Sequence, residues 1–466
     1  MKNLLLLLSI CLLPQLLFSQ NQSPIDGTWD GSIILQGQPL LISLTFNTMD
    51  GATDGSINIP QQNAFNLPVD VPVLTADSIQ FQFETGTGTA IFRASLESEN
   101  PDSIDGIFTQ SGVELPFVMA RSIADSDDGA EYFTEKDISF TLDSLTIAGT
   151  LVEPDTLRSE SLVILISGSG AQTRNSPVAG FGVFEELAEQ LAIQGIATFR
   201  YDDRGTGQST GSPDAPLDDL AGDLEGISTY FSGQPPSSSN HFDDIIYLGH
   251  SQGGLISLLA ADSTNPLGII LMAAPTLPGD QIILQQIREI SAAQNISEDI
   301  LARNLEFQQA VFEAARTGEG WSELEADLEQ RLRDQLNQLP EEQRATLGDM
   351  DQFIASQVSR QLDGAKSPWF KSFIETDPRP LLREAEVPIL ALFGENDSQV
   401  MLEPNRSALG EIDGNVEIVT IPAANHLFQV SESGMPGEYG ILDKEFAPGL
   451  IDQITAFVTK LEESSR

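Results

Sequence analysis

One serine in this sequence stands in the setting that nucleophilic catalysis requires. Ser251 lies between Gly249 and Gly253, which gives the pattern G-x-S-x-G. An apolar run, residues 245–248, precedes the pattern, and a second apolar stretch, residues 255–261, follows it directly. This order predicts a strand, a sharp turn and a helix, with small residues that tolerate a strained serine backbone. Such a turn raises the serine hydroxyl above the end of the strand, where it can attack a carbonyl carbon.

A serine nucleophile needs a general base, and the sequence contains three histidines. His250 is next to Ser251, and its backbone position directs its side chain away from the nucleophile. His241 precedes the strand that leads to Ser251, so we expect it at the opposite edge of the sheet. His426 follows an apolar run, residues 416–420, through a short loop, which places it at the same edge as Ser251. By elimination, His426 is the predicted base and then the predicted acid.

The base in turn needs a carboxylate that orients its ring and stabilises its charged form. Residues 387–393 form another apolar run, and Asp397 lies in the loop that follows it. The chain order Ser251, Asp397, His426 is the order that accompanies this serine motif. Glu395, in the same loop, is the alternative carboxylate.

Two N–H donors are needed for the negative oxygen that forms when the carbonyl is attacked. The first predicted donor is the backbone N–H of Gln252, directly after the nucleophile. The second is the N–H of Ser169 in a glycine-rich turn after the apolar run 162–166, with Gly170 as the next candidate. A phosphate-binding loop is excluded here, because no lysine follows at the required spacing. Further candidate substrate contacts are Gly170, Arg174 and Trp369.

The elements that must position these residues fall into two regions. Residues 21–130 predict a small all-β domain, a sandwich or a barrel, from short alternating segments separated by turn residues. Residues 131–466 alternate buried strands with helices, which predicts a parallel α/β sheet. A block at about residues 278–378 is helical throughout and predicts a cap inserted over that sheet. The expected strands of the first region are residues 28–33, 40–46, 78–83, 90–96, 103–108 and 114–119, and the expected cap helices are residues 282–293, 297–317, 321–336 and 350–362.

The composition restricts the partners of the protein. The 466 residues include 69 acidic and 23 basic side chains, for a formal net charge of -46. This charge disfavours nucleic acid and anionic membranes as partners. Salt adaptation and a merely soluble acidic surface both fit it. No carboxylate cluster stands out from this acidic background, so we expect neither a metal nor another cofactor.

The first twenty residues have the features of an export signal. Lys2 precedes an apolar stretch, residues 4–13, and a small residue, Ser19, precedes a plausible cleavage point. The apolar stretch is too short for a membrane span, and no later run approaches the needed length. The only cysteine, Cys11, lies within this segment, so the mature protein would contain no thiol. We therefore expect export to the periplasm or the medium, with residues 122–129 as a linker between the two domains.

The combination of motifs resembles the α/β-hydrolase superfamily over about residues 135–465. More narrowly, it is similar to exported bacterial esterases related to the serine aminopeptidase-like hydrolases. The resemblance implies an α/β-hydrolase fold with a helical cap, a Ser-Asp-His triad and no cofactor. The matching stretches are I-S-G-S-G at residues 166–170, Y-D-D-R-G-T-G-Q-S at 201–209, G-H-S-Q-G-G at 249–254, S-P-W-F at 367–370 with D-P at 377–378, G-E-N-D at 394–397 and N-H-L-F-Q at 425–429.

The stretch at residues 202–209 is expected to support the oxyanion turn from behind. Within it, Arg204 is expected to pair with Asp202 or Asp203 in a structural ion pair, and a substrate clamp is the alternative. The aromatic residues of the cap, Trp369 among them, either line an acyl pocket or belong to the cap's own core.

The predicted activity is hydrolysis of carboxylic esters with neutral, short-to-medium acyl groups through an acyl-enzyme. An aminopeptidase-like amide hydrolase is the enzymatic alternative, because acidic residues of the cap could hold a free amine. A binding protein with an inert hydrolase domain is the alternative from another class. The β domain could serve folding and spacing, or it could bind a polymer, a partner or part of the substrate, and its ligand is not predicted.

Overall fold

The computed structural model describes residues 25–465 with gaps at residues 36–37, 50–51, 60–63, 76–77, 86–87, 97–102, 111–112, 122–131, 143, 156–160, 236, 338–343, 345–348 and 411–414. The expected export signal, residues 1–20, and the expected linker, residues 122–129, lie outside the described residues. Contacts divide the chain into a first unit that ends at Ser122 and a second unit that holds nearly all of the remainder.

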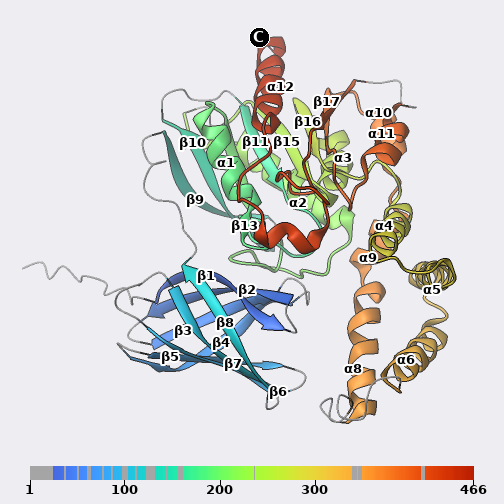
Figure 1. The fold of residues 1–466 in the computed structure, drawn as a ribbon. Helices are drawn as coiled ribbons and strands as arrows, with labels where there is room; N and C mark the ends of the chain where they lie inside the picture. Colours follow the sequence, from blue (N-terminus) through green and yellow to red (C-terminus); the bar gives the residue numbers. More distant parts are fainter. Residues whose placement is uncertain are drawn as a thin grey trace, which may run out of the picture. The chain divides into compact units, whose positions relative to one another are not determined.

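The first unit is a closed barrel of eight antiparallel strands (Figure 1). Alternate side chains point inward, and the barrel is filled by aromatic rings, among which Phe81 stacks on Phe92 with ring centroids 4.6 Å apart. The predicted all-β domain is confirmed, and of the two expected architectures the barrel is the one formed. The strands are β1 (Gly27–Leu35), β2 (Gln38–Met49), β3 (Ala52–Ile59), β4 (Ala64–Leu74), β5 (Ser78–Thr85), β6 (Gly88–Ser95), β7 (Ser103–Gln110) and β8 (Val113–Arg121).

The second unit is built on an eight-stranded sheet with the order β18-β17-β16-β15-β11-β14-β10-β9. The six strands from β18 to β14 in this order are parallel neighbours, and β10 and β9 extend the sheet in antiparallel fashion. The strand order reverses between β11 and β15, so the loops after these two strands meet at one edge, as ligand sites of α/β sheets do. The strands are β9 (Phe133–Leu142), β10 (Leu145–Pro154), β11 (Ser161–Ile166), β14 (Ala197–Tyr201), β15 (Asp244–His250), β16 (Gly268–Met272), β17 (Ile389–Gly394) and β18 (Val416–Ile421).

Helices cover both faces of this sheet (Figure 1). On one face, α1 (Val183–Ile193) and α12 (Leu450–Ser465) share an apolar core with the strands. On the other face, α2 (Leu217–Ser232) and α3 (Gln252–Thr264) form a second core. The strands between the two layers are apolar on both sides, and every residue of β11 and β17 is buried. The predicted α/β-hydrolase architecture is confirmed.

The cap lies between β16 and β17 in the sequence, where the helical block was expected. Figure 1 shows its longer helices grouped to one side of the sheet. The described elements of the cap and of the segment that leads into β17 are α4 (Gly279–Ala293), α5 (Glu298–Thr317), α6 (Trp321–Asn337), α8 (Met350–Asp363), the 3₁₀ turn η2 (Gly364–Lys366), α9 (Pro368–Glu375) and α10 (Pro378–Glu384). The short helix α9 begins where the Ser367 hydroxyl accepts the Phe370 N–H at 3.0 Å, with a proline at its first position.

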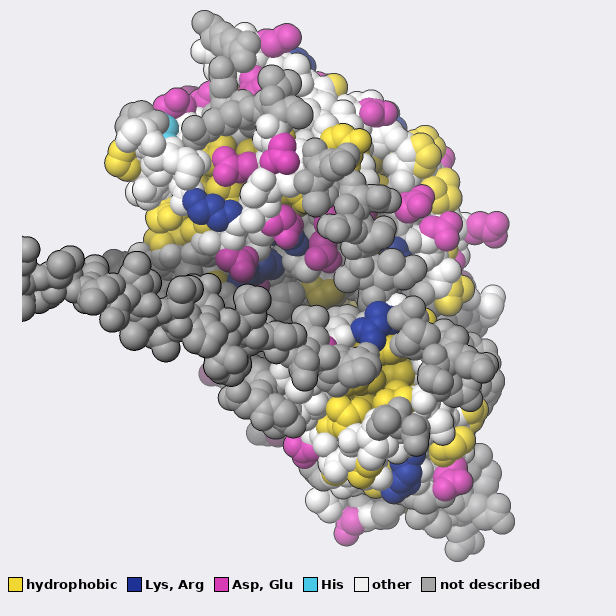
Figure 2. Space-filling model, turned by 90° about the vertical axis from the view of Figure 1, so that its left-hand side faces the viewer, with side chains coloured by type: hydrophobic (Ala, Val, Ile, Leu, Met, Phe, Trp, Pro, Cys, Tyr) yellow, Lys and Arg dark blue, Asp and Glu magenta, His cyan; other side chains and the backbone are white. Residues whose placement is uncertain are grey.

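The remaining small elements are the two-stranded pair β12 (Pro177–Val178) and β13 (Phe181–Gly182), the helix α11 (Leu402–Gly410) and the 3₁₀ helix η3 (Pro436–Ile441). On the face shown in Figure 2, acidic side chains are scattered among the described residues and not gathered into one patch. None of the helices that the structure describes has the length and apolarity needed to cross a membrane.

Candidate active site

The turn between β15 and α3 is the strained nucleophile elbow that the sequence predicts. Ser251 has φ 53° and ψ -122°, a conformation that costs energy in a residue with a β-carbon. A β-carbon on Gly249 would lie 2.2 Å from the Gly253 carbonyl oxygen, and one on Gly253 would lie 2.1 Å from the Ile166 carbonyl oxygen. Both positions therefore require glycine, because the adjacent backbone cannot move without breaking the sheet.

His426 and Asp397 form a buried hydrogen-bonded pair at the same edge of the sheet. His426 Nδ1–H donates to Asp397 Oδ2 at 2.8 Å, and the two side chains are 6% and 0% exposed. The other oxygen, Oδ1, accepts the N–H groups of Gln399 at 2.7 Å and Val400 at 2.9 Å. The carboxylate is therefore fixed on both sides, and the bond to Nδ1 leaves the lone pair on His426 Nε2.

Glu395, the alternative carboxylate, lies elsewhere. Its side chain is exposed, and Oε2 accepts the backbone N–H of Ala423 at 2.9 Å. Glu395 thus holds the loop that leads to His426, whereas Asp397 contacts the imidazole itself.

His250 connects the elbow to the loop that carries His426. Its Nε2–H donates to the His426 carbonyl oxygen at 2.9 Å, and the two imidazole rings have centroids 4.9 Å apart. Burial lowers the pKa of His250 to about 3, and the nearby His426 acts in the same direction. His250 is therefore a neutral donor, which the sequence reasoning dismissed because its side chain does not point at the nucleophile.

Ser251, the predicted nucleophile, has a side chain that no hydrogen bond among the described residues engages. Within the part of the chain that the structure describes, Ser251 Oγ makes no hydrogen bond, and in particular none to His426 Nε2. Catalytic hydrogen bonds of this kind often shorten only in the substrate complex. Ser251 N–H donates to the Met272 carbonyl at 2.8 Å, which ties the elbow to the neighbouring strand.

The glycine-rich turn after β11 lies against the elbow. A β-carbon on Gly168 would be 3.4 Å from both Ser251 Cβ and His250 Nδ1. Among the described residues, the N–H groups of Ser169 and Gln252 donate to no other group. Both predicted donors are therefore available for a substrate oxygen, and Gln252 stands at the first position of α3, where the helix dipole favours negative charge.

The residues after β14 hold this turn from behind, as expected. We define the oxyanion loop as residues 167–172. Asp203 accepts the Ser167 hydroxyl at 2.9 and 2.8 Å and the Gln172 N–H at 2.8 Å. The Asp203 N–H also donates to the Gln172 carbonyl at 3.0 Å. Asp203 therefore contacts both ends of the oxyanion loop.

The expected pairing of Arg204 with Asp202 or Asp203 is wrong. Arg204 Nε and Nη2 each donate to Asp223 of α2 at 2.6 Å, and Nη1 lies 3.3 Å from Asp219. The ion pair is structural, but it joins the loop to α2, because Arg204 points away from its two acidic neighbours in the chain.

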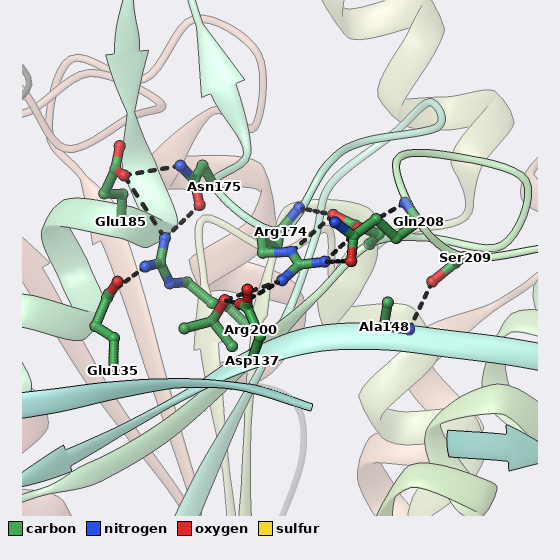
Figure 3. Close-up of polar contacts among 11 residues, drawn as sticks. Glu135, Asp137, Ala148, Arg174, Asn175, Glu185, Arg200, Gln208 and Ser209 are labelled. Atoms are coloured by element: carbon green, nitrogen blue, oxygen red, sulfur yellow. Dashed lines mark hydrogen bonds and ion pairs between the residues drawn. The ribbon is translucent and has the colours of Figure 1, made fainter. Parts of the chain in front are cut away.

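Arg174, a candidate substrate contact, is instead the partner of Asp202. Its Nε and Nη2 donate to the Asp202 carboxylate at 3.1 and 2.7 Å, and its Nη1 donates to Asp137 and Thr150 at 3.0 Å. Figure 3 shows Arg174 with Asp137 and Gln208 among the residues around its guanidinium group. These bonds engage every guanidinium nitrogen of Arg174, and Arg174 does not line the cavity described below.

A second arginine continues this network toward the edge of the sheet. Arg200 of β14 is only 3% exposed, and it contacts Asn175, Glu135 and Glu185 (Figure 3). The network therefore ties β9, β14 and α1 to the segment that follows the oxyanion loop. Charges held this way fix geometry and contribute little net stability, because burying them is costly.

A cavity of about 780 Å³ adjoins the oxyanion side of the elbow and extends beneath the cap. Gly168, Gly170 and Gln252 line it on the sheet side, and Trp369 and Phe370 of α9 line it on the cap side. Its size is that of sites that accept a drug-sized ligand. Apolar and acidic side chains complete the wall, with Ile256, Phe307 and Val311 among the former and Asp203, Asp214 and Asp223 among the latter.

Among the described residues, a hydrogen bond joins the cap to the elbow. Trp369 Nε1–H donates to the side-chain oxygen of Gln252 at 2.8 Å, and its ring stacks on Phe373 with centroids 5.6 Å apart. Gln252 is 2% exposed, so this bond satisfies a buried amide oxygen. Of the three candidate substrate contacts, Gly170 and Trp369 line the cavity and Arg174 does not.

The described residues contain no group of three or more His, Cys, Asp or Glu side chains placed to hold a metal ion. The sheet order, the elbow after β15, the His-Asp pair beyond β17 and β18, and the cap after β16 together define an α/β-hydrolase.

Comparisons with known proteins agree with this class. The family model described as serine aminopeptidase, S33, matches residues 179–361. Esterase EstD of Thermotoga maritima is 24% identical over 387 residues, which cover 81% of this chain and 78% of the relative. These matches make the chain similar to esterases and to serine aminopeptidase-like hydrolases, in agreement with its α/β-hydrolase fold.

Two solved structures are also similar. A proline iminopeptidase from Mycobacterium smegmatis has a TM-score of 0.42 and 13% identity, and the match covers 71% of this chain and 100% of that one. The Pyrococcus furiosus esterase Pf2001 has a TM-score of 0.39 and 13% identity, with coverage of 71% and 91%.

Proposed function

We propose that this enzyme hydrolyses neutral carboxylic esters of short-to-medium acyl length through an acyl-enzyme on Ser251. The observation that carries the proposal is the buried Asp397–His426 pair at the sheet edge where Ser251 sits on its strained turn. A lone serine motif is common, but a serine with an oriented imidazole at the same edge is a catalytic arrangement.

In the first half of the reaction, Ser251 Oγ attacks the ester carbonyl carbon while His426 Nε2 takes the hydroxyl proton. The carbonyl oxygen becomes an anion and is held by the N–H groups of Gln252 and Ser169. The intermediate collapses, the C–O bond to the alcohol breaks, and the departing alcohol takes the proton from His426. Asp397 keeps its charge throughout and stabilises the imidazolium.

In the second half, a water molecule replaces the alcohol. His426 Nε2 removes a proton from this water as it attacks the acyl carbon, and the oxyanion forms again at the same two N–H groups. Collapse breaks the bond to Ser251 Oγ, which recovers its proton from His426 as the carboxylic acid leaves.

The cavity supports the preference for neutral substrates. Its carboxylates outnumber its one arginine, Arg204, and that arginine is already paired with Asp223 and Asp219. An anionic acyl group would therefore meet unfavourable charge, whereas an alkyl chain could lie against Ile256 and Phe370.

The test uses p-nitrophenyl esters and a fluorophosphonate probe on the full chain and on Ser251→Ala. We expect turnover and labelling with the full chain and loss of at least about 10³-fold in kcat with the variant. A variant that keeps full turnover would overturn the proposal. An amino-acid p-nitroanilide compared with the matching ester separates the amide-hydrolase alternative, which predicts the faster reaction for the anilide.

A further inference from the structure

Asp203 stands between the oxyanion loop and the cavity. It accepts hydrogen bonds from Ser167 and Gln172, the two residues that flank the part of the loop containing Ser169. Asp203 also lines the cavity, as do Ser167 and Gly168 of the same loop, so it lies beside both the oxyanion loop and this space. Among the described residues, no other side chain is hydrogen-bonded to both Ser167 and Gln172.

The surroundings leave Asp203 without a cationic partner among the described residues. Arg174 pairs with Asp202, and Arg204 pairs with Asp223 and Asp219. Burial raises the pKa of Asp203 to about 7, and the charges of Asp202 and Asp223 act in the same direction, against the hydrogen bonds from the loop. The phenol of Tyr201 also faces this group, and its own pKa is raised by burial and stays far above neutrality.

We propose that Asp203 is a positioning residue for the oxyanion hole: its ionised carboxylate fixes the oxyanion loop so that the Ser169 N–H meets the developing negative charge. The inference rests on the proposed ester hydrolysis at Ser251. An ionised carboxylate accepts from both Ser167 and Gln172 through charge-assisted bonds, which are about twice as strong as neutral ones. A protonated carboxyl group loses one acceptor position and the charge, so the loop is held less firmly.

The substitution Asp203→Asn introduces an amide with the shape and the neutral charge of the protonated acid. The variant and the wild type should therefore behave alike at low pH and diverge as Asp203 ionises. Both proteins contain the same Ser251, Asp397 and His426, so the ratio of their rates reports on the change at position 203.

The experiment measures kcat and KM for a p-nitrophenyl ester from pH 5.5 to 8.5. We expect the ratio of wild-type to Asp203→Asn kcat to be near one at pH 5.5 and to reach about fivefold to tenfold above pH 8, with similar KM values. A ratio that does not change with pH, or a change in KM alone, would overturn the inference, since a merely structural loss lowers kcat equally at every pH.

Two further variants keep the test decisive. Ser167→Ala removes one hydroxyl and should lower kcat about threefold to tenfold at pH 8, so it reports on the same contact even if Asp203→Asn fails to fold. Asp219→Asn removes a carboxylate that contacts Arg204 but not the oxyanion loop, and its ratio to wild type should stay near one at all pH values. Full activity in Ser167→Ala together with a flat Asp203→Asn ratio contradicts the inference.

The failures of the two proposals are distinguishable. A Ser251→Ala variant that still turns over the ester shows that the proposed function is wrong, and the role of Asp203 falls with it. An inactive Ser251→Ala variant combined with a flat Asp203→Asn ratio leaves ester hydrolysis in place and removes only the positioning role.

Discussion

At the scale of single residues, the arrangement around His426 assigns distinct tasks to two neighbouring carboxylates. Asp397 contacts the imidazole, and Glu395 contacts the backbone of the loop that presents it. A fixed carboxylate selects the tautomer in which Nε2 can take a proton, and an incorrect tautomer is inactive as a base.

Replacement of Asp397 by Asn is therefore expected to lower kcat by about 10³- to 10⁴-fold. The Asn side chain offers an N–H where His426 Nδ1–H needs an acceptor, which favours the wrong tautomer. Glu395→Gln is the matched control, because it keeps an acceptor oxygen for Ala423 and should remain within about threefold of wild type. Steady-state kinetics on a p-nitrophenyl ester measure both, and equal losses in the two variants would contradict the assignment.

His250 makes the stability of the second unit depend on pH. Its pKa is about 3 in the folded protein and near 6.5 when unfolded, so the unfolded chain binds more protons between these values. The contribution of neutral His250 to the free energy of unfolding is fully present above pH 6.5 and is lost as the pH falls toward 3. From pH 7 to pH 5 the expected loss is about 2 kcal/mol.

His250→Gln removes this titration and keeps an N–H donor. The difference in unfolding free energy between pH 7 and pH 5 should therefore be about 2 kcal/mol smaller in the variant than in wild type. Urea unfolding followed by circular dichroism measures the difference. Identical pH dependence in the two proteins would show that His250 is not held neutral.

Residues whose type and position are required by the proposed chemistry could be predicted from the sequence. Residues that meet only through the packing of the folded chain could not. Ser251, Asp397 and His426 follow from residue type and strand order. The segment that contains Asp203 was expected to support the oxyanion turn, but the acceptor role of Asp203 and the donor role of His250 were not predicted, because their partners are backbone groups and a hydroxyl whose positions depend on the fold. Arg204 was paired wrongly because nearness in sequence suggested a contact that its side-chain direction does not permit.

At the scale of elements, the elbow requires glycine at the positions where the backbone of one element lies directly against the backbone of another. Gly249 in β15 lies against the backbone of α3, and Gly253 in α3 lies against the end of β11. These close backbone contacts and the neighbouring strands fix the conformation of Ser251, so its strained φ persists.

Gly249→Ala is expected to abolish activity and to destabilise the second unit by more than about 3 kcal/mol, because the new methyl group would overlap the Gly253 carbonyl. Gly222→Ala is the control, since a β-carbon at this position of α2 meets nothing within 4 Å. It should raise stability by about 0.5–1 kcal/mol, as Ala is the better helix former. Thermal unfolding and ester turnover report both effects, and a folded, active Gly249→Ala protein would contradict the packing argument.

Elements with strong periodicity were predictable, and weakly patterned ones were not. The long cap helices and the buried strands appear where the apolar spacing indicated them. Strands β3 and β4 were missed because Gly55, Pro68 and Pro72 interrupt their alternation. The helix α9 was not predicted separately because it has only eight residues, although its motif at residues 367–370 was recognised.

At the scale of the whole molecule, the net charge of -46 is the dominant feature. Carboxylates outnumber cations throughout, and repulsion among them opposes the compact state. Salt shortens the range of this repulsion to about 3 Å at 1 M.

Raising NaCl from 0.1 to 1 M is therefore expected to increase the melting temperature by about 2–5 °C. Choline chloride at the same ionic strength is the control, because screening does not depend on the identity of the cation. Differential scanning calorimetry measures both. An increase with sodium alone would indicate specific ion binding in place of screening.

The hydrogen bond between Trp369 and Gln252 gives the enzyme an internal optical reporter. Any motion that separates α9 from α3 must exchange this bond for bonds to water, at a net cost of about 1 kcal/mol. That cost favours the joined arrangement roughly fivefold at equilibrium. Because the partly buried indole would become more hydrated in such a motion, its fluorescence would report the separation of the two helices.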